Sequence, residues 1–390
     1  MEKAKDKICV ILTGGTICSV PGENGKNQSN AAKTGTRLTD DYEKNSASPF
    51  RDKVSFDIEF LKPDILSENM TVDAWNGIIK IFKKIKCNKY KGIIVLHGTD
   101  TLAYTSSFLS FALAGINIPV CMVSAQQRLG TEDKNGNWIR NNESNGYANF
   151  RASVELIMNN IKPNVYAVYR NEPLDSNAPI ESGEFLVHYG SHLLQCANGS
   201  NNFHSRDEML IPDTRNAKLE GASFESGACL YRSINRISNK VLMLMPYTNL
   251  DYRAVNLKGV KAIVHGTYHS ESVCIGRPMQ EFRTKPERNN YKLEEIAKKD
   301  RYYSILYLLK KCDEKNVPVF LTPCDIDSAN YGTTANACIG GAIPIGSSVV
   351  TVEAVYAKAV LWCALRDENS SLESFLKQSI NCEFDKTLNS

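Results

Sequence analysis

The sequence has no large excess of charge of either sign and no long apolar run. It carries 46 lysines and arginines against 43 aspartates and glutamates, so its formal net charge is only +3. This balance argues against a basic surface for nucleic acid. The N-terminal apolar stretch from Ile8 to Leu12 is too short for a secretory leader or for the roughly 20 residues of a membrane span. We expect a cytoplasmic protein without a nucleic-acid or membrane partner.

Metal-binding and cofactor-binding patterns are also missing. None of the 12 cysteines is spaced as Cys-x-x-Cys, and none stands near a pair of histidines with zinc spacing. Most cysteines lie in apolar contexts, which is typical of buried free thiols in a reducing compartment. The glycine-rich loops of the common nucleotide-binding motifs do not occur. We expect no metal and no cofactor.

The first half of the sequence does show a regular alternation of strand and helix patterns. Continuous apolar runs predict strands at 7–12, 92–96, 119–125 and 164–170. Apolar residues at helical spacing predict helices at 72–85, 105–115 and 148–160. Apolar strands that alternate with helices are typical of an α/β fold, in which a parallel sheet is covered on both faces.

The pattern is lost between 182 and 234 and then resumes. Strands are predicted at 240–247, 260–266 and 317–323, and helices at 303–316 and 351–366. A length of 390 residues favours two or three domains. We predict an N-terminal domain at 1–205 that carries the functional site, a linker at 206–235 and a smaller α/β domain at 236–390. The charged segment 276–303 is predicted to be a surface insertion.

Three polar segments follow predicted strands. They are Thr13–Ile17 (TGGTI), His97–Thr101 (HGTDT) and Ser124–Arg128 (SAQQR). Ligands of open α/β sheets bind beyond the carboxyl ends of the strands, so we expect the first two segments to meet at one cleft. The first offers the hydroxyl of Thr16 as a nucleophile, and the backbone N–H of Gly15 as an oxyanion donor.

The second segment places the Thr99 hydroxyl beside the Asp100 carboxylate, which together can orient an amine or take up a proton. Either segment alone is also compatible with an ordinary tight turn or a helix start. The two together, each after a strand, are a much more specific signal.

These segments resemble the two signatures of the bacterial-type L-asparaginases, and within that family its cytosolic type I branch. Further resemblances are the stretch Ser67–Met70 and the region 331–358. The resemblance implies a two-domain fold, with a parallel-sheet N-terminal domain and a smaller α/β C-terminal domain. It also implies hydrolysis of asparagine, or a related small amide, through an acyl-enzyme on Thr16.

The same resemblance implies roles for the other site residues. Thr99 and Asp100 would form a second catalytic cluster, and Asp100 would also bind the substrate ammonium. Ser67 would hold the substrate carboxylate. The remaining residues implied to line the substrate site are Gly15, Glu68, Gly98 and Ala125. The polar stretch Gly22–Tyr42 stands where the family has a mobile lid; a disordered insertion is the alternative interpretation.

The sequence departs from the family at its catalytic lysine. The corresponding region is taken to be Glu181–Leu193, which contains no lysine, and His188 or Tyr189 is the predicted substitute. The stretch Glu143–Gly146 also differs from the family pattern. His269 is a further candidate, either as a contributor to a neighbouring subunit's site or as a residue of a polar turn.

Two alternatives to the hydrolase therefore remain. One is the glutaminase-type component of a tRNA-dependent amidotransferase, which normally has an additional N-terminal domain before the first signature strand. The other is a degenerate protein that binds an amino acid without turnover. The resemblance also implies a homodimer or a homotetramer.

Overall fold

The structure is a computed structural model that describes residues 4–22, 24–171, 185–205, 208–211, 213–216, 229–276, 302–325, 331–346, 350–365 and 371–384. These residues form two compact units. The first runs to Ile237 and includes Ile380–Cys382, and the second starts at Ser238 and includes Glu383. The predicted α/β class with two domains is confirmed.

The first unit is built on a seven-stranded sheet with the order β11-β10-β9-β6-β5-β1-β4. The strands are β1 (Asp6–Gly14), β4 (Val54–Ile65), β5 (Gly92–Leu96), β6 (Val120–Val123), β9 (Val165–Tyr169), β10 (Phe185–Tyr189) and β11 (Glu208–Ile211). Strands β4, β1, β5, β6 and β9 are parallel, whereas β10 and β11 are antiparallel to their neighbours. The continuous apolar runs are central strands, and every residue from Ile8 to Leu12 is fully buried.

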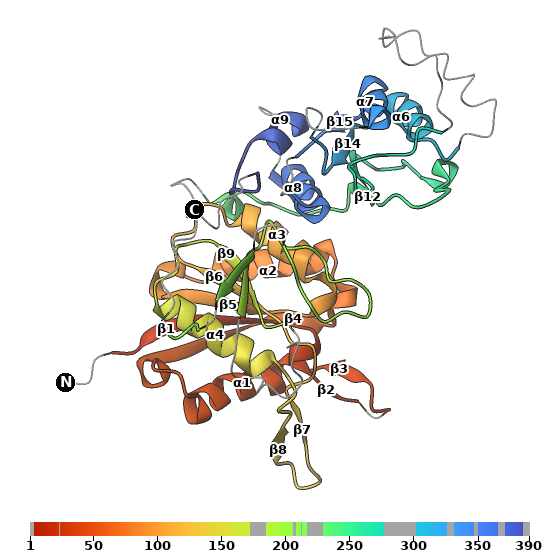
Figure 1. Ribbon diagram of the computed structural model, residues 1–390. Coiled ribbons are helices and arrows are strands. Elements are labelled where there is room, and N and C mark those ends of the chain that lie inside the picture. The colour runs from red at the N-terminus through yellow and green to blue at the C-terminus, as the bar shows by residue number, and fades with distance from the viewer. Residues whose placement is uncertain are drawn as a thin grey trace. The chain divides into compact units, whose positions relative to one another are not determined.

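Helices cover both faces of this sheet. They are α1 (Ala31–Asn45), α2 (Val72–Lys84), α3 (Leu102–Ala112) and α4 (Gly146–Met158). Figure 1 shows α1 beside α4 across one face, with α2 and α3 across the other. On the second face, Trp75 of α2 stacks on Phe108 of α3 with ring centroids 4.5 Å apart. The indole N–H of Trp75 also donates to the Thr105 hydroxyl, so α2 and α3 pack as one layer.

Two long elements were not predicted, β4 and α1. The apolar residues of β4 alternate with polar ones, so the strand is only half buried and has no continuous apolar run. The sequence of α1 is mostly polar. Together with the hairpin of β2 (Ser19–Pro21) and β3 (Asn27–Ser29), α1 accounts for the described part of the stretch that was predicted to be a lid or a disordered insertion.

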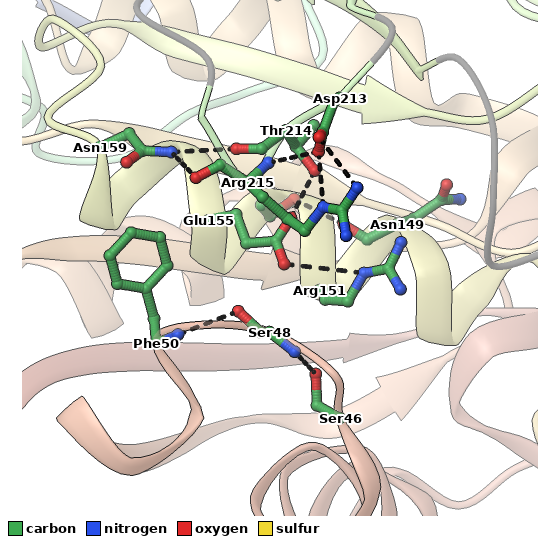
Figure 2. Close-up of polar contacts among 11 residues, drawn as sticks. Ser46, Ser48, Phe50, Asn149, Arg151, Glu155, Asn159, Asp213, Thr214 and Arg215 are labelled. Carbon is green, nitrogen blue, oxygen red and sulfur yellow. Dashed lines mark hydrogen bonds and ion pairs between the residues drawn. The ribbon is translucent and has the colours of Figure 1, made fainter.

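The predicted linker 206–235 is partly wrong, because β11 lies within it and joins the edge of the sheet. The next described segment is also fixed, to α4. The Thr214 hydroxyl donates to Glu155 at 2.5 Å, and the Asn159 amide donates to the carbonyl of Thr214 at 2.9 Å. Figure 2 draws both contacts as dashed lines. This part of the chain therefore packs on the first unit.

The second unit has a parallel sheet with the order β12-β13-β14-β15. Its strands are β12 (Val241–Leu244), β13 (Ala262–Gly266), β14 (Val319–Thr322) and β15 (Ile343–Pro344), and its helices are α6 (Ile305–Asp313), α7 (Gly332–Ile339), α8 (Val352–Leu365) and α9 (Leu372–Lys377). The ammonium of Lys358 in α8 is buried and pairs with the carboxylate of Glu383. Most of the predicted insertion 276–303 lies outside the described residues.

The remaining described elements are short. The hairpin of β7 (Gly130–Glu132) and β8 (Trp138–Arg140) precedes α4. Single 3-10 turns are η1 (Thr16–Cys18), η2 (Arg51–Lys53), η3 (Ser67–Asn69), η4 (Cys87–Lys89), η5 (Thr99–Thr101), η6 (Leu230–Arg232) and η7 (Tyr252–Ala254). Three of these turns, η1, η3 and η5, follow the strands that carry the predicted site.

Candidate active site

The predicted site lies where the order of strands in the first sheet reverses. From β1 the chain crosses to β4 on one side, whereas from β5 it proceeds to β6 on the other. The connections after β1 and β5 therefore leave this part of the sheet in opposite directions. Such a switch point is the usual ligand site of an open α/β sheet.

The two signature loops touch through their glycines. A Cβ atom on Gly15 would lie 2.2 Å from the Cα of Gly98, and a Cβ on Gly98 would lie 2.3 Å from the hydroxyl oxygen of Ser67. Gly15 also has a φ of 79°, which side chains other than that of glycine rarely allow. The close approach of the two loops therefore requires glycine on both, and the predicted meeting of TGGT and HGTDT is observed.

Thr16 begins η1 directly after this contact and is half-buried. Its carbonyl accepts a hydrogen bond from the Ser19 hydroxyl at 2.9 Å. Within the described residues, no hydrogen bond engages the Thr16 hydroxyl. One expectation is wrong: the N–H of Gly15 donates to the carbonyl of Ile65 at 2.8 Å, so it is not free to bind an oxyanion.

Ser67 and Asp100 are joined across the loops after β4 and β5. The Ser67 hydroxyl donates to the Asp100 carboxylate at 3.1 Å and accepts from the Asp100 backbone N–H at 3.2 Å. The hydroxyl of Thr101 donates to the Ser67 carbonyl at 2.9 Å. Ser67 is buried, whereas its neighbour Glu68 is exposed and, in the described structure, makes no hydrogen bond or ion pair with this cluster.

A buried histidine supports the second loop. The ring Nδ1–H of His97 donates to the carbonyl of Gly98 at 2.7 Å, which assigns the lone pair of the neutral ring to Nε2. Burial lowers the pKa of His97 to about 4. The ring is therefore neutral at pH 7 and acts as a fixed donor that shapes the loop.

The third loop, after β6, is held by side-chain amides. Ala125 is fully buried. The N–H of Gln126 donates to the Asn145 side chain at 3.0 Å, and Asn145 in turn donates to the carbonyl of Arg170 at 2.8 Å. Asn145 belongs to the stretch that departs from the family pattern, and here it ties the end of β6 to the end of β9.

A pocket of about 410 Å³ lies beside Thr99 and Asp100. Its other wall is the loop that follows β10, from Gln195 to Phe203. The polar lining residues include Gln195, Asn198, Ser200 and Asn201, and none of the described residues that line the pocket is a lysine, arginine or histidine. This loop was not among the predicted site residues, although its polar run directly before the aromatic Phe203 was an available signal.

His188 and Tyr189 lie in β10, before that loop. Nδ1 of His188 is 2.9 Å from the Ser205 hydroxyl, and burial lowers the pKa of this histidine to about 3. The ring of Tyr189 packs on that of Tyr166 in β9, with centroids 5.6 Å apart. The side chain of His188 is therefore held against Ser205, and that of Tyr189 is held against β9. A catalytic role for either residue stays a prediction.

The remaining features considered from the sequence are His269, metal-binding clusters and membrane-spanning segments. His269 is exposed in the second unit. Across the described side chains, no cluster of three or more His, Cys, Asp or Glu residues could hold a metal ion. Among the described helices, none is long and apolar enough to cross a membrane.

The described residues define a two-domain α/β protein, with the candidate site at the switch point of the first sheet. Residues 7–177 match the sequence family described as "Asparaginase, N-terminal". The match covers this first part of the chain and agrees with the resemblance of its two signature loops to that family.

Solved asparaginases share the fold over nearly the whole chain. The L-asparaginase of Thermococcus kodakarensis superposes with a TM-score of 0.68 at 18% identity, covering 97% of this chain and 99% of that one. L-asparaginase I of Vibrio cholerae gives a TM-score of 0.62 at 22% identity, covering 98% and 99%. At these identities the likeness shows the fold.

Among curated proteins, the D subunit of glutamyl-tRNA(Gln) amidotransferase from Saccharolobus islandicus is 35% identical over 124 residues. The match covers 32% of this chain and 26% of the relative, so the chain aligns with about a quarter of that protein's length.

Proposed function

We propose that the protein is an asparaginase-like amidohydrolase that converts L-asparagine, or a related small amide, to the carboxylic acid and ammonia. The observation that carries this proposal is the interlocking of Gly15 and Gly98. This contact supports a shared site for Thr16, which directly follows Gly15, and for the hydrogen-bonded pair of Ser67 and Asp100. A nucleophile and a carboxylate anchor at one switch point fit a small amino-acid amide.

In the proposed reaction, Asp100 binds the substrate ammonium, while Ser67 contacts the substrate carboxylate and holds Asp100. The Thr16 oxygen attacks the side-chain amide carbon, and the bond to nitrogen breaks, releasing ammonia that carries the proton removed from Thr16. Thr99 provides a second hydroxyl beside the reacting atoms. Water then attacks the acyl-enzyme, which restores the Thr16 hydroxyl and frees the acid, so one water is consumed for each amide.

Two alternatives have an observation in their favour. The match to the amidotransferase component favours a glutaminase that works within a complex. The lack of a lysine, arginine or histidine among the described residues that line the pocket favours a protein that binds an amino acid without turnover. Hydrolysis of glutamine that depends on a second protein would indicate the first alternative. Binding of aspartate without any release of ammonia would indicate the second.

The test is release of ammonia from asparagine and from glutamine by the wild-type chain and by Thr16→Ala. We expect the variant to lose at least about 1,000-fold in kcat, because the covalent step is removed. Thr131→Ala, which changes an exposed threonine of the β7–β8 hairpin, is the matched control and should retain full activity. A folded Thr16→Ala that turns over at the wild-type rate would exclude Thr16 as the nucleophile.

We further propose a homodimer or homotetramer in the cytoplasm, as the family resemblance implies. Light scattering after size-exclusion chromatography measures the assembly directly. A monomer that is fully active would contradict this proposal.

A further inference from the structure

The pocket wall opposite Thr99 and Asp100 is the loop Gln195–Phe203, which is closed at its base and stabilised by hydrogen bonds within it. The loop is held at its base, where Leu193 bridges Ser205 and the N–H of Leu194 donates to the carbonyl of His204 at 2.9 Å. The side chain of Asn171, just beyond β9, exchanges two hydrogen bonds of 2.9 Å with the backbone of Phe203. Both ends of the loop are therefore fixed to the first sheet.

Cys196 closes the turn of this loop. Its sulfur is 2.7 Å from the carbonyl oxygen of Ser200 and 3.2 Å from that of Asn202. The N–H of Ser200 donates to the carbonyl of Ala197 at 3.0 Å, and the N–H of Asn202 donates to the Ser200 hydroxyl at 3.1 Å. The turn thus has a defined shape, and the Cys196 thiol is its central donor.

Gln195 connects this loop to the catalytic one. Its side-chain N–H donates to the carbonyl of Thr99 at 2.9 Å, and its side-chain oxygen accepts from the N–H of Ala103 at 3.3 Å. Ala103 lies in the first turn of α3, where backbone N–H groups lack partners within the helix. The N-cap residue Thr101 makes no side-chain hydrogen bond to that turn. The amide of Gln195 therefore caps α3 from a distant segment.

We infer that Gln195 is a positioning residue for Thr99 and Asp100, and that Cys196 keeps it in place by closing the turn. This inference rests on the proposed function, which assigns Thr99 and Asp100 to the reaction. A single planar amide fixes the carbonyl of Thr99 and the first turn of the helix that follows Asp100. It thereby sets the distance between the catalytic loop and the neutral wall of the pocket.

The first test measures backbone exchange and does not depend on activity. Hydrogen–deuterium exchange is followed in peptides that span 97–104, in the wild type, in Gln195→Leu and in Gln195→Glu. Leucine removes both hydrogen bonds, and we expect exchange at the start of α3 to accelerate about tenfold or more. Glutamate keeps the acceptor for Ala103 but cannot donate to Thr99, so its effect should be smaller. Unchanged exchange in Gln195→Leu would overturn the inference.

The second test is kinetic. At a temperature where every variant is folded, kcat for amide hydrolysis should fall about tenfold or more in Gln195→Leu, with a smaller change in KM. The control Gln378→Leu, an exposed glutamine of the second unit, should change neither. A merely structural role would lower the melting temperature and leave kcat of the folded enzyme unchanged, and that result would also overturn the inference.

Cys196 offers a rescue experiment. Cys196→Ser introduces a hydroxyl that can donate to one of the same two carbonyls, and this variant should stay within about threefold of wild-type kcat. Cys196→Ala removes the donor and should resemble Gln195→Leu in both tests. Equal behaviour of the two variants would remove Cys196 from the inference. If the wild type releases no ammonia while the exchange result holds, the proposed function has failed and the contact between Gln195 and α3 still stands.

Discussion

The tripeptide His-Gly-Thr occurs at the carboxyl end of a buried strand in each of the two units, and the comparison separates local conformation from chemistry. His97–Thr99 follows β5, and His265–Thr267 lies at the end of β13. In both, the histidine Nδ1–H donates to the carbonyl of the next glycine, at 2.7 Å and 2.6 Å. Burial lowers the pKa of each histidine to about 4. The same three residues at the same kind of strand end thus adopt the same local contact.

The surroundings of the two tripeptides are different. Gly98 meets Ser67 and Gly15, whereas a Cβ on Gly266 would meet the sulfur of Met245 at 2.7 Å. The residue after the threonine is Asp100 in the first unit, where it bonds Ser67. In the second unit it is Tyr268, and the Thr267 hydroxyl donates instead to the carbonyl of Pro323 at 3.0 Å.

The His-Gly-Thr motif therefore determines the conformation of the loop, whereas residues from the neighbouring strands determine which chemistry the loop can support. In the first unit, β1 and β4 bring a glycine turn and a serine to the loop, and the strand order reverses beside it. In the second unit the corresponding hydroxyl bonds a backbone carbonyl, which leaves it with a structural role. Variants at equivalent positions of the two tripeptides can separate these roles.

Among the variants that compare the two tripeptides, the largest loss of activity and stability is expected for a substitution of Gly98. In Gly98→Ala the new methyl group would overlap the short, buried side chain of Ser67 and the backbone of Gly15. We expect a loss of at least about 100-fold in kcat/KM and a destabilisation of about 3 kcal/mol, because two packed loops must separate. Ammonia release and urea unfolding measure the two effects.

The matched variant is Gly266→Ala. Its methyl group meets the end of the flexible Met245 side chain, which can move, so a destabilisation below about 1 kcal/mol is expected. Activity should be unchanged. If Gly98→Ala and Gly266→Ala lowered the free energy of unfolding equally, the close packing of Gly15 on Gly98 would not be what makes Gly98 necessary.

The next largest effect is the loss of folding stability at low pH that the two buried histidines cause. The pKa of His265 is about 4 in the folded protein, whereas the ordinary value for histidine is 6.5. Below pH 6.5 this histidine becomes protonated in the unfolded chain but stays neutral in the folded chain. The free energy of unfolding is therefore unaffected by this residue above pH 6.5 and decreases as the pH falls from 6.5 toward 4. At about 1.4 kcal/mol per pH unit, this one residue should cost about 2 kcal/mol between pH 7 and pH 5.

Urea unfolding at both pH values tests this expectation. His265→Gln cannot titrate, so the loss between pH 7 and pH 5 should shrink by about 2 kcal/mol relative to the wild type. His97→Gln should flatten the pH dependence of the first unit in the same way. A pH dependence that is identical in the wild type and in both variants would contradict the burial of neutral rings.

Several features of the fold could be predicted because they depend on local sequence. Central strands such as β5 are continuous apolar runs, and the loops after them carry recognisable residues. Strand β4 escaped prediction because its alternating pattern reflects a half-buried strand. Helix α1 escaped because its buried face is small and partly polar.

The site was only partly predictable, for a different reason. The contact of Gly15 with Gly98 follows from strand order, which the position of the motifs suggested. The pairing of Gly15 N–H with Ile65 and the placement of Gln195 beside Thr99 depend on which distant backbone groups lack partners. Such information is absent from any single stretch of sequence.

The smallest expected effect compares the Ser67 hydroxyl, which lies against Gly98 of the first tripeptide, with the hydroxyl of Thr267 in the second. Ser67→Ala removes the hydroxyl that donates to the Asp100 carboxylate and accepts from the Asp100 backbone N–H. Hydrogen bonds to charged groups contribute about 1.5–3 kcal/mol. Because Asp100 is the proposed anchor of the substrate, we expect kcat/KM to fall about tenfold to thirtyfold, with a destabilisation of only about 1 kcal/mol. Thr267→Val removes the bond to Pro323 and should cost a similar amount of stability but no activity. If Thr267→Val lowered kcat/KM as much as Ser67→Ala, the second tripeptide would share in the reaction, and the structural role assigned to it would be wrong.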